Sequence, residues 1–91
     1  MPTYLIERHI PGAGKLSPDE LRVISQKSNE ILASLGPEIR WLHTYVLDDR
    51  MYCVYESNGV DAIVEHARCM GVPADLISEV QTVISPATAK K

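Results

Sequence analysis

The chain has 91 residues, enough for one domain with a single core, and we expect one ferredoxin-like domain over residues 1–91 with an ordered core at about 3–86. The net charge of −3 and the scattered basic residues exclude the positive surface typical of nucleic-acid binders. No apolar run approaches the roughly 20 residues that span a bilayer, and no export signal is recognisable, so we expect a cytoplasmic protein that does not enter membranes.

The first expected element is a strand over residues 3–10, which alternates apolar and polar side chains. Tyr4, Ile6 and Ile10 mark one face of this strand. The other face carries Leu5, Glu7 and His9. A glycine- and proline-rich turn follows at residues 11–14 and ends the strand.

A helix is predicted over residues 18–35 because its start and stop signals are both strong. Ser17 and Glu20 have the spacing of a capping box, and Pro18 suits the first helical position. Gly36 and Pro37 stop the helix. The apolar stripe that recurs at helical spacing comprises Leu21, Ile24, Ser28, Ile31, Leu32 and Leu35.

A β-hairpin is predicted over residues 39–48 and 51–56, with the polar break between them as its turn. Regular alternation places Trp41, His43, Tyr45 and Leu47 on one face of the first strand. A fully buried face would not carry a histidine, and a solvated one would not need a tryptophan. We therefore interpret this face as a lined pocket or an interface.

The partner of His43 on the second hairpin strand depends on the length of the turn. A two-residue tip places His43 opposite Glu56, which favours a histidine–carboxylate site. A three-residue loop makes His43 share its face with Cys53 and Tyr55, which favours a thiolate site for nickel, copper or zinc. The sequence leaves both registers open.

A second helix is predicted over residues 60–70, ended by Gly71, and a last strand over residues 78–84. The resulting order β-α-β-β-α-β is that of the ferredoxin-like α+β fold, a four-stranded antiparallel sheet with two helices on one face. Because the other face carries apolar side chains, we expect a homodimer of the dimeric α+β barrel type to cover it.

Each candidate functional residue also has a structural interpretation. His43 can be a hydrogen-bonded interface histidine, and Glu7 can form an ion pair with Arg8, Arg40 or a partner subunit. His66 and Cys69 are helical neighbours with the spacing of a two-ligand metal clip, which is a weak signal without further ligands. Cys53 is also compatible with an ordinary core position, and we expect both cysteines to be reduced.

Several strings of the chain, in the same order, resemble a family of small bacterial proteins of unknown function that are described in part as nickel-binding proteins. These strings are Tyr4–Arg8, Trp41–Val46, Tyr52–Glu56, Glu65–Ala67 and Gly71–Val80. The resemblance implies a ferredoxin-like fold, a dimer and a nickel-binding role. The residues in these strings whose chemistry suits a metal are His43, Glu7, Cys53, Glu56 and His66.

Two functions follow as hypotheses. The first is a small metal-binding protein for Ni²⁺ or a similar divalent ion, acting in binding or homeostasis, with no catalytic residue assigned. The alternative is a small-molecule binder or cofactor-free enzyme of the monooxygenase or isomerase type, with a pocket formed by Trp41, His43 and Tyr45. This alternative rests on the fold class alone.

Overall fold

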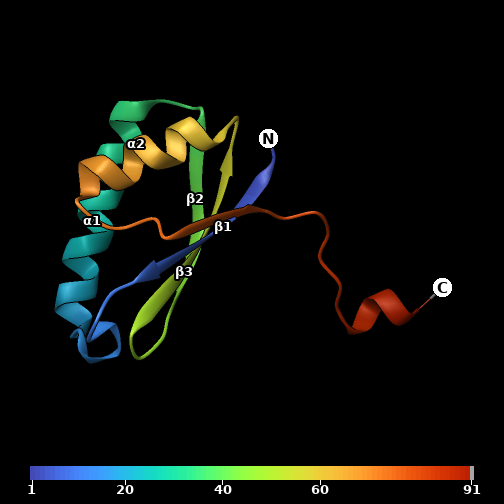
Figure 1. Ribbon diagram of the computed structural model, residues 1–91, viewed down its shortest axis with the longest axis horizontal. Coiled ribbons are helices and arrows are strands. Elements are labelled where there is room, and N and C mark those ends of the chain that lie inside the picture. The colour runs from blue at the N-terminus through green and yellow to red at the C-terminus, as the bar shows by residue number, and fades with distance from the viewer. Residues whose placement is uncertain (91) are drawn as a thin grey trace.

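The computed structural model describes residues 1–90 and has the predicted ferredoxin-like α+β architecture. The four strands form one antiparallel sheet in the order β2-β3-β1-β4, and both helices cover the same face of it (Figure 1). The elements are β1 (Thr3–His9), η1 (Ala13–Lys15), α1 (Pro18–Leu35), β2 (Ile39–Val46), β3 (Arg50–Ser57), α2 (Val60–Met70), β4 (Leu76–Glu79) and η2 (Pro86–Ala89). Within residues 1–90, neither helix is both long and apolar enough to cross a bilayer.

Both helices begin and end where the local sequence signals place them. Ser17 Oγ accepts a hydrogen bond from the Glu20 amide at 3.1 Å, and the Ser17 amide donates to Glu20 Oε1 at 2.9 Å, which completes the capping box of α1. Gly36 and Gly71 follow the two helices with φ of 85° and 71°, a backbone region that glycine enters without a Cβ clash. The predicted bounds of both helices are confirmed.

The core lies between the helices and one face of the sheet. On β3, every second residue from Met51 to Ser57 is buried, and on β1 the buried positions are Tyr4, Ile6 and Arg8. Ile63 of α2 is fully buried against this face. The alternation on β1 therefore matches the sequence prediction, with one addition: Arg8 also lies on the buried face, among apolar side chains.

The predicted pairing of the hairpin is wrong in both of its alternatives. The turn closes with the Leu47 amide donating to the Arg50 carbonyl at 2.9 Å, and His43 pairs with Val54 rather than facing Glu56 or sharing a face with Cys53. A bulge between Trp41 and His43 shifts the register by one residue. Because a bulge inserts an extra residue on one strand, it reverses the alternation, and Trp41 does not share a face with His43.

The last strand is also shorter and earlier than predicted. β4 spans Leu76–Glu79 instead of residues 78–84, and it pairs with β1 only from Glu7 to Tyr4. The strand ends because β1 itself begins at Thr3, whose carbonyl accepts a final hydrogen bond from Val80 at 2.8 Å. Beyond it, residues 81–90 are exposed and extend away from the sheet (Figure 1).

Gly14 packs η1 against the tip of the β2–β3 hairpin. Its amide donates to the Asp48 carbonyl at 3.0 Å, and a Cβ at Gly14 would lie 2.9 Å from Asp48 Cα. A Gly14→Ser variant is therefore expected to lower the free energy of unfolding by about 1–3 kcal/mol, the usual cost of overpacking. Urea denaturation measures this change.

The matched control is Gly59→Ser, because a Cβ at Gly59 meets nothing within 4 Å and its φ of −171° suits any residue. Serine is also a good helix cap at this position. Equal free energies of unfolding for the two variants would show that the hairpin tip accommodates a Cβ at Gly14 without loss of stability.

Candidate functional site

The face of the sheet turned away from the helices, called the open face below, carries a row of polar and aromatic side chains. Directly paired residues of antiparallel strands share a face, so the register defines this surface. It includes Leu5, Glu7, His9, Arg40, His43, Tyr45, Arg50, Tyr52, Val54, Glu56, Leu76 and Ser78. Neither helix covers it (Figure 1).

Glu7 lies at the centre of a hydrogen-bonded cluster on the open face. The Tyr52 hydroxyl donates to Glu7 Oε1 at 2.8 Å, and His9 Nε2 lies 3.1 Å from Glu7 Oε2. Arg50 Nη1 is 3.9 Å from Oε1, so Arg50, rather than Arg8 or Arg40, is the guanidinium nearest this carboxylate. The Tyr52 hydrogen bond, and secondarily that of His9, lowers the pKa of Glu7. Glu7 is thus a hydrogen-bonded carboxylate held beside an imidazole.

His43 is an exposed side chain near the β2 edge of the same face. Its ring stands edge-on to Tyr45, with centroids 5.1 Å apart and planes at 80°. Tyr45 pairs with Tyr52, which pairs with Glu7, whereas His43 pairs with Val54. Glu7 and His43 are therefore two strands apart, roughly 10 Å by the usual strand spacing. One protomer does not bring them to a common metal ion.

Glu56, another predicted ligand, also lies on the open face. Its Oε1 is 2.6 Å from Arg40 Nη2, across the β2–β3 pair. The carboxylate is thus engaged in an ion pair near the far end of the hairpin. Glu56 is separate from the Glu7 cluster.

The remaining two predicted ligands, Cys53 and His66, lie on the helix-facing side of the sheet. Cys53 Sγ accepts a hydrogen bond from Arg8 Nε at 3.4 Å, and His66 Nε2 is 3.1 Å from Ser28 Oγ. Burial, and secondarily the charge of Arg8, lowers the pKa of His66 to about 4. Within residues 1–90, no three His, Cys, Asp or Glu side chains converge on a common metal position.

His66 and Cys69 do not form a helical metal clip, for which their spacing gives only a weak signal. His66 points into the protein and is 2% exposed, whereas Cys69 is exposed and its Sγ lies 3.4 Å from Glu65 Oε1. Residues three apart are neighbours on a helix surface, but in α2 the boundary between the buried and the exposed side runs between His66 and Cys69. Both cysteines are free thiols.

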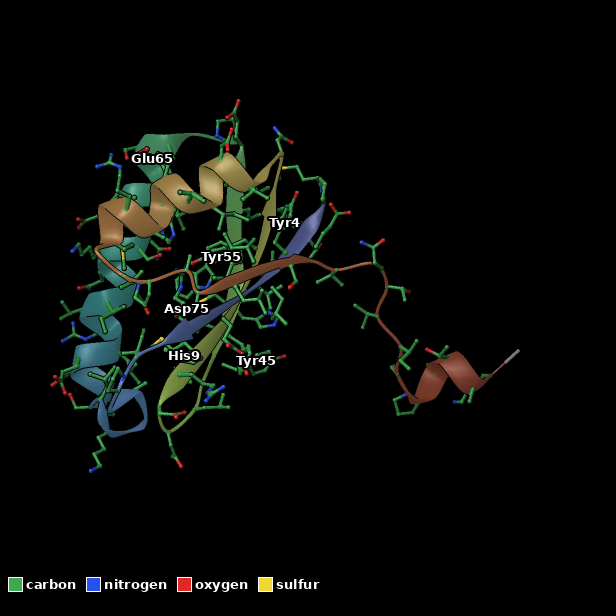
Figure 2. All side chains as sticks on the ribbon, viewed as in Figure 1. Tyr4, His9, Tyr45, Tyr55, Glu65 and Asp75 are labelled. Carbon is green, nitrogen blue, oxygen red and sulfur yellow. The ribbon has the colours of Figure 1, made fainter. Side chains whose placement is uncertain are left out.

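The bulge also separates the aromatic residues that were predicted to line one pocket. Trp41 packs against the core, and its Nε1 donates to Thr44 Oγ1 at 2.9 Å. Tyr45 projects from the opposite side of the sheet, away from Tyr55, which lies beneath the helices (Figure 2). Trp41, His43 and Tyr45 therefore do not line one pocket, and the residues assigned to the alternative hypothesis are wrong.

Two functional candidates went unassigned at the sequence level. His9 was placed on the same face as Glu7 but not among the ligands, although a Glu-x-His spacing on a strand puts both side chains side by side. The sequence suggests Arg8 only as an ion-pair partner of Glu7, whereas the structure places it on the buried face of β1. The sequence signal for Arg8 is its position: a charged residue follows Tyr4 and Ile6 at every second position of the strand, on the face that is buried.

Comparisons with known proteins point to one family. The family model described as "Nickel responsive protein SCO4226-like" matches residues 4–80. The crystal structure of SCO4226 from Streptomyces coelicolor A3(2) superposes with a TM-score of 0.74 and 16% identity, covering 90% of this chain and 99% of that one. At this identity the likeness shows the fold alone. No curated protein matches the chain.

Proposed function

The chain belongs to the SCO4226-like family of nickel-responsive proteins, and from this membership we propose that it binds Ni²⁺ on the open face of a homodimer. The observation that carries the proposal is the Glu7–His9 pair, whose facing atoms are 3.1 Å apart. Imidazole nitrogen and carboxylate oxygen are ligands that suit a divalent first-row metal. The proposed compartment is the cytoplasm, where free cysteines stay reduced.

The surroundings of Glu7 support a ligand role for its carboxylate. The Tyr52 hydroxyl fixes one oxygen, and its hydrogen bond lowers the pKa of Glu7, so the group is ionised at neutral pH. Hydrogen bonds of this kind orient a metal-binding carboxylate and keep it in the binding position. The second oxygen faces His9 and is the one that would approach the ion.

A single protomer supplies too few ligands, and a two-fold dimer supplies the rest. In an isologous interface, any contact of residue i with residue j of the partner is made twice. We assign Glu7 and His9 of one protomer and the partner subunit's His43 to each site, giving two equivalent sites per dimer. Cys53 and His66 lie on the other side of the sheet, and Glu56 is held by Arg40, so they are not part of this site.

Calorimetric titration of Ni²⁺ into untagged protein tests the ligand assignment. Glu7→Gln, His9→Ala and His43→Ala are each expected to weaken Ni²⁺ binding more than tenfold, since loss of a direct ligand exceeds the roughly 10- to 100-fold effect of losing an outer partner. The control Glu30→Gln removes an exposed carboxylate from α1 and should leave the affinity unchanged. Equal affinities across all five proteins would exclude this site.

Mixing two inactive variants tests whether the site is shared between subunits. A heterodimer of Glu7→Gln and His43→Ala protomers keeps one intact site, made from the Glu7 of one chain and the His43 of the other. After random exchange at equal concentrations, about a quarter of the wild-type number of sites should reappear. A site built within one protomer would show no such recovery.

A further inference from the structure

A cavity of about 440 Å³ lies between α1 and the helix-facing side of the sheet, on the opposite side from the proposed nickel site. Its volume is in the range of pockets that hold small organic ligands. The apolar side chains that line it include Leu21, Ile24, Trp41, Val46, Met51 and Met70. Among the described residues, none that lines the cavity belongs to the Glu7 cluster.

The composition of α1 explains why the helix leaves this space open. Leu21, Leu32 and Leu35 pack against the core near the two ends of the helix. Between them the inward position is Ser28, a small residue whose hydroxyl is 3.1 Å from His66. A large apolar side chain at Ser28 would fill the space that the serine leaves.

Arg8 projects into this region and carries a charge that no described carboxylate neutralises. The residue is 3% exposed, its Nη1 donates to the Pro73 carbonyl at 2.6 Å, and its Nε donates to Cys53 Sγ. Its Nη2 is buried without a hydrogen-bond partner, and Arg8 forms no ion pair within residues 1–90. A buried cation with only neutral partners is costly, and an anion would relieve that cost.

The other polar groups of the cavity also favour an anion. Lys27 adds a second positive charge to the lining, and within residues 1–90 the lining contains no Asp or Glu, although the chain as a whole is acidic. Burial raises the pKa of Tyr55 to about 12, so its hydroxyl remains a hydrogen-bond donor at neutral pH. His66 also lines the cavity.

We propose that this cavity binds a small organic carboxylic acid with an apolar body, whose carboxylate pairs with Arg8 and whose body contacts the side chains around Ile24 and Met51. Within the described part of the chain, Arg8 Nη2 has no hydrogen-bond partner, so its N–H groups are free to donate a charge-assisted hydrogen bond to a carboxylate. The apolar wall selects a ligand with a hydrocarbon portion over a simple inorganic anion. This proposal stands independently of nickel binding.

The single tryptophan of the chain, Trp41, lines the cavity and reports on its occupancy. Titration of octanoate into metal-free protein, followed by Trp41 fluorescence, is expected to show saturable binding of one molecule per protomer. Octan-1-ol keeps the apolar body without the charge, and inorganic phosphate keeps a charge without the body. Both should bind at least tenfold more weakly than octanoate.

Substitution of Arg8 tests what its positive charge contributes to binding, separately from the apolar lining of the cavity. Arg8→Met should weaken octanoate binding at least tenfold and leave octan-1-ol binding within about twofold, and Arg8→Lys, which keeps the charge but loses the planar guanidinium, should have an intermediate octanoate affinity. The control Arg22→Met removes an exposed guanidinium of α1 and should bind like the wild type. Equal octanoate affinity in wild type and Arg8→Met would overturn the proposal.

A measurement on the wild-type protein keeps the proposal testable if Arg8→Met does not fold. Octanoate should shift the backbone amide resonances of Ile24, Met51 and Tyr55 in a saturable manner. Resonances of open-face residues such as His43 should not move. Absence of saturable shifts, or shifts confined to the open face, would overturn the assignment of the cavity.

Discussion

Lowering the pH from 7 to 5 is expected to reduce the free energy of unfolding by about 2 kcal/mol through His66 alone. Burial holds the pKa of His66 at about 4 in the folded protein, against 6.5 for a free imidazole. At pH 7 the residue is mainly neutral in both states. At pH 5 only the unfolded state is protonated, so acid favours unfolding, and the loss grows as pH falls from 6.5 towards 4.

The environment of His66 explains why protonation is so unfavourable. Nε2 faces Ser28 Oγ, the ring stands against Tyr55, and Nδ1 is buried with no partner. A proton on Nδ1 would create a buried N–H without an acceptor, near the positive charge of Arg8. No acidic side chain forms an ion pair with His66 in the described part of the chain.

Urea denaturation at pH 7, 6 and 5 tests this expectation. A His66→Gln variant should be less stable at pH 7 but should lose most of the pH dependence between 7 and 5. His43→Gln removes an exposed histidine and should keep the wild-type slope. Carboxylates with lowered pKa values, such as Glu7 and Glu20, lose their stabilising interactions mainly below about pH 5, so they do not mask the effect. Identical slopes for wild type and His66→Gln would contradict the assignment.

The second large effect is expected at the proposed dimer interface: Tyr45→Glu should weaken dimerisation about a hundredfold or more, because it would bury an unpaired carboxylate between two sheets. Tyr45 is 59% exposed on the open face, close to His43. Leu76 is 57% exposed on β4, at the other edge of the same face, and adds apolar surface that a partner subunit would cover. Sedimentation velocity at micromolar concentration should show a wild-type dimer and a monomeric variant.

The matched control is Val64→Glu, which also places a carboxylate at an exposed apolar position but on α2. This variant should remain dimeric. Tyr45→Glu should also lose high-affinity Ni²⁺ binding while keeping octanoate binding, since the proposed nickel site spans two subunits and the proposed octanoate cavity lies within one. A monomeric wild type, or a dimeric Tyr45→Glu, would contradict the proposed interface.

The sequence alone determined the element order, both helices and the fold class, because the signals for these features are local. Ser17 and Glu20 reach each other within one helical turn, and Gly36 and Gly71 stop the helices at their own positions. The alternation of β1 depends only on strand geometry. These features need no information from distant parts of the chain.

Only the tertiary structure decided which side chains meet. The bulge beside Leu42 turns Trp41 towards the helices and leaves His43 on the open face, and it depends on how β2 pairs with β3. The end of β4 depends on where β1 begins. Arg8, Ser28 and His66 line one cavity, although they come from three different elements that local sequence rules cannot bring together. Strand alternation already places Glu7 and His9 side by side. Register and packing arise from contacts between distant segments, so the position of the other candidate ligands relative to this pair followed from the fold.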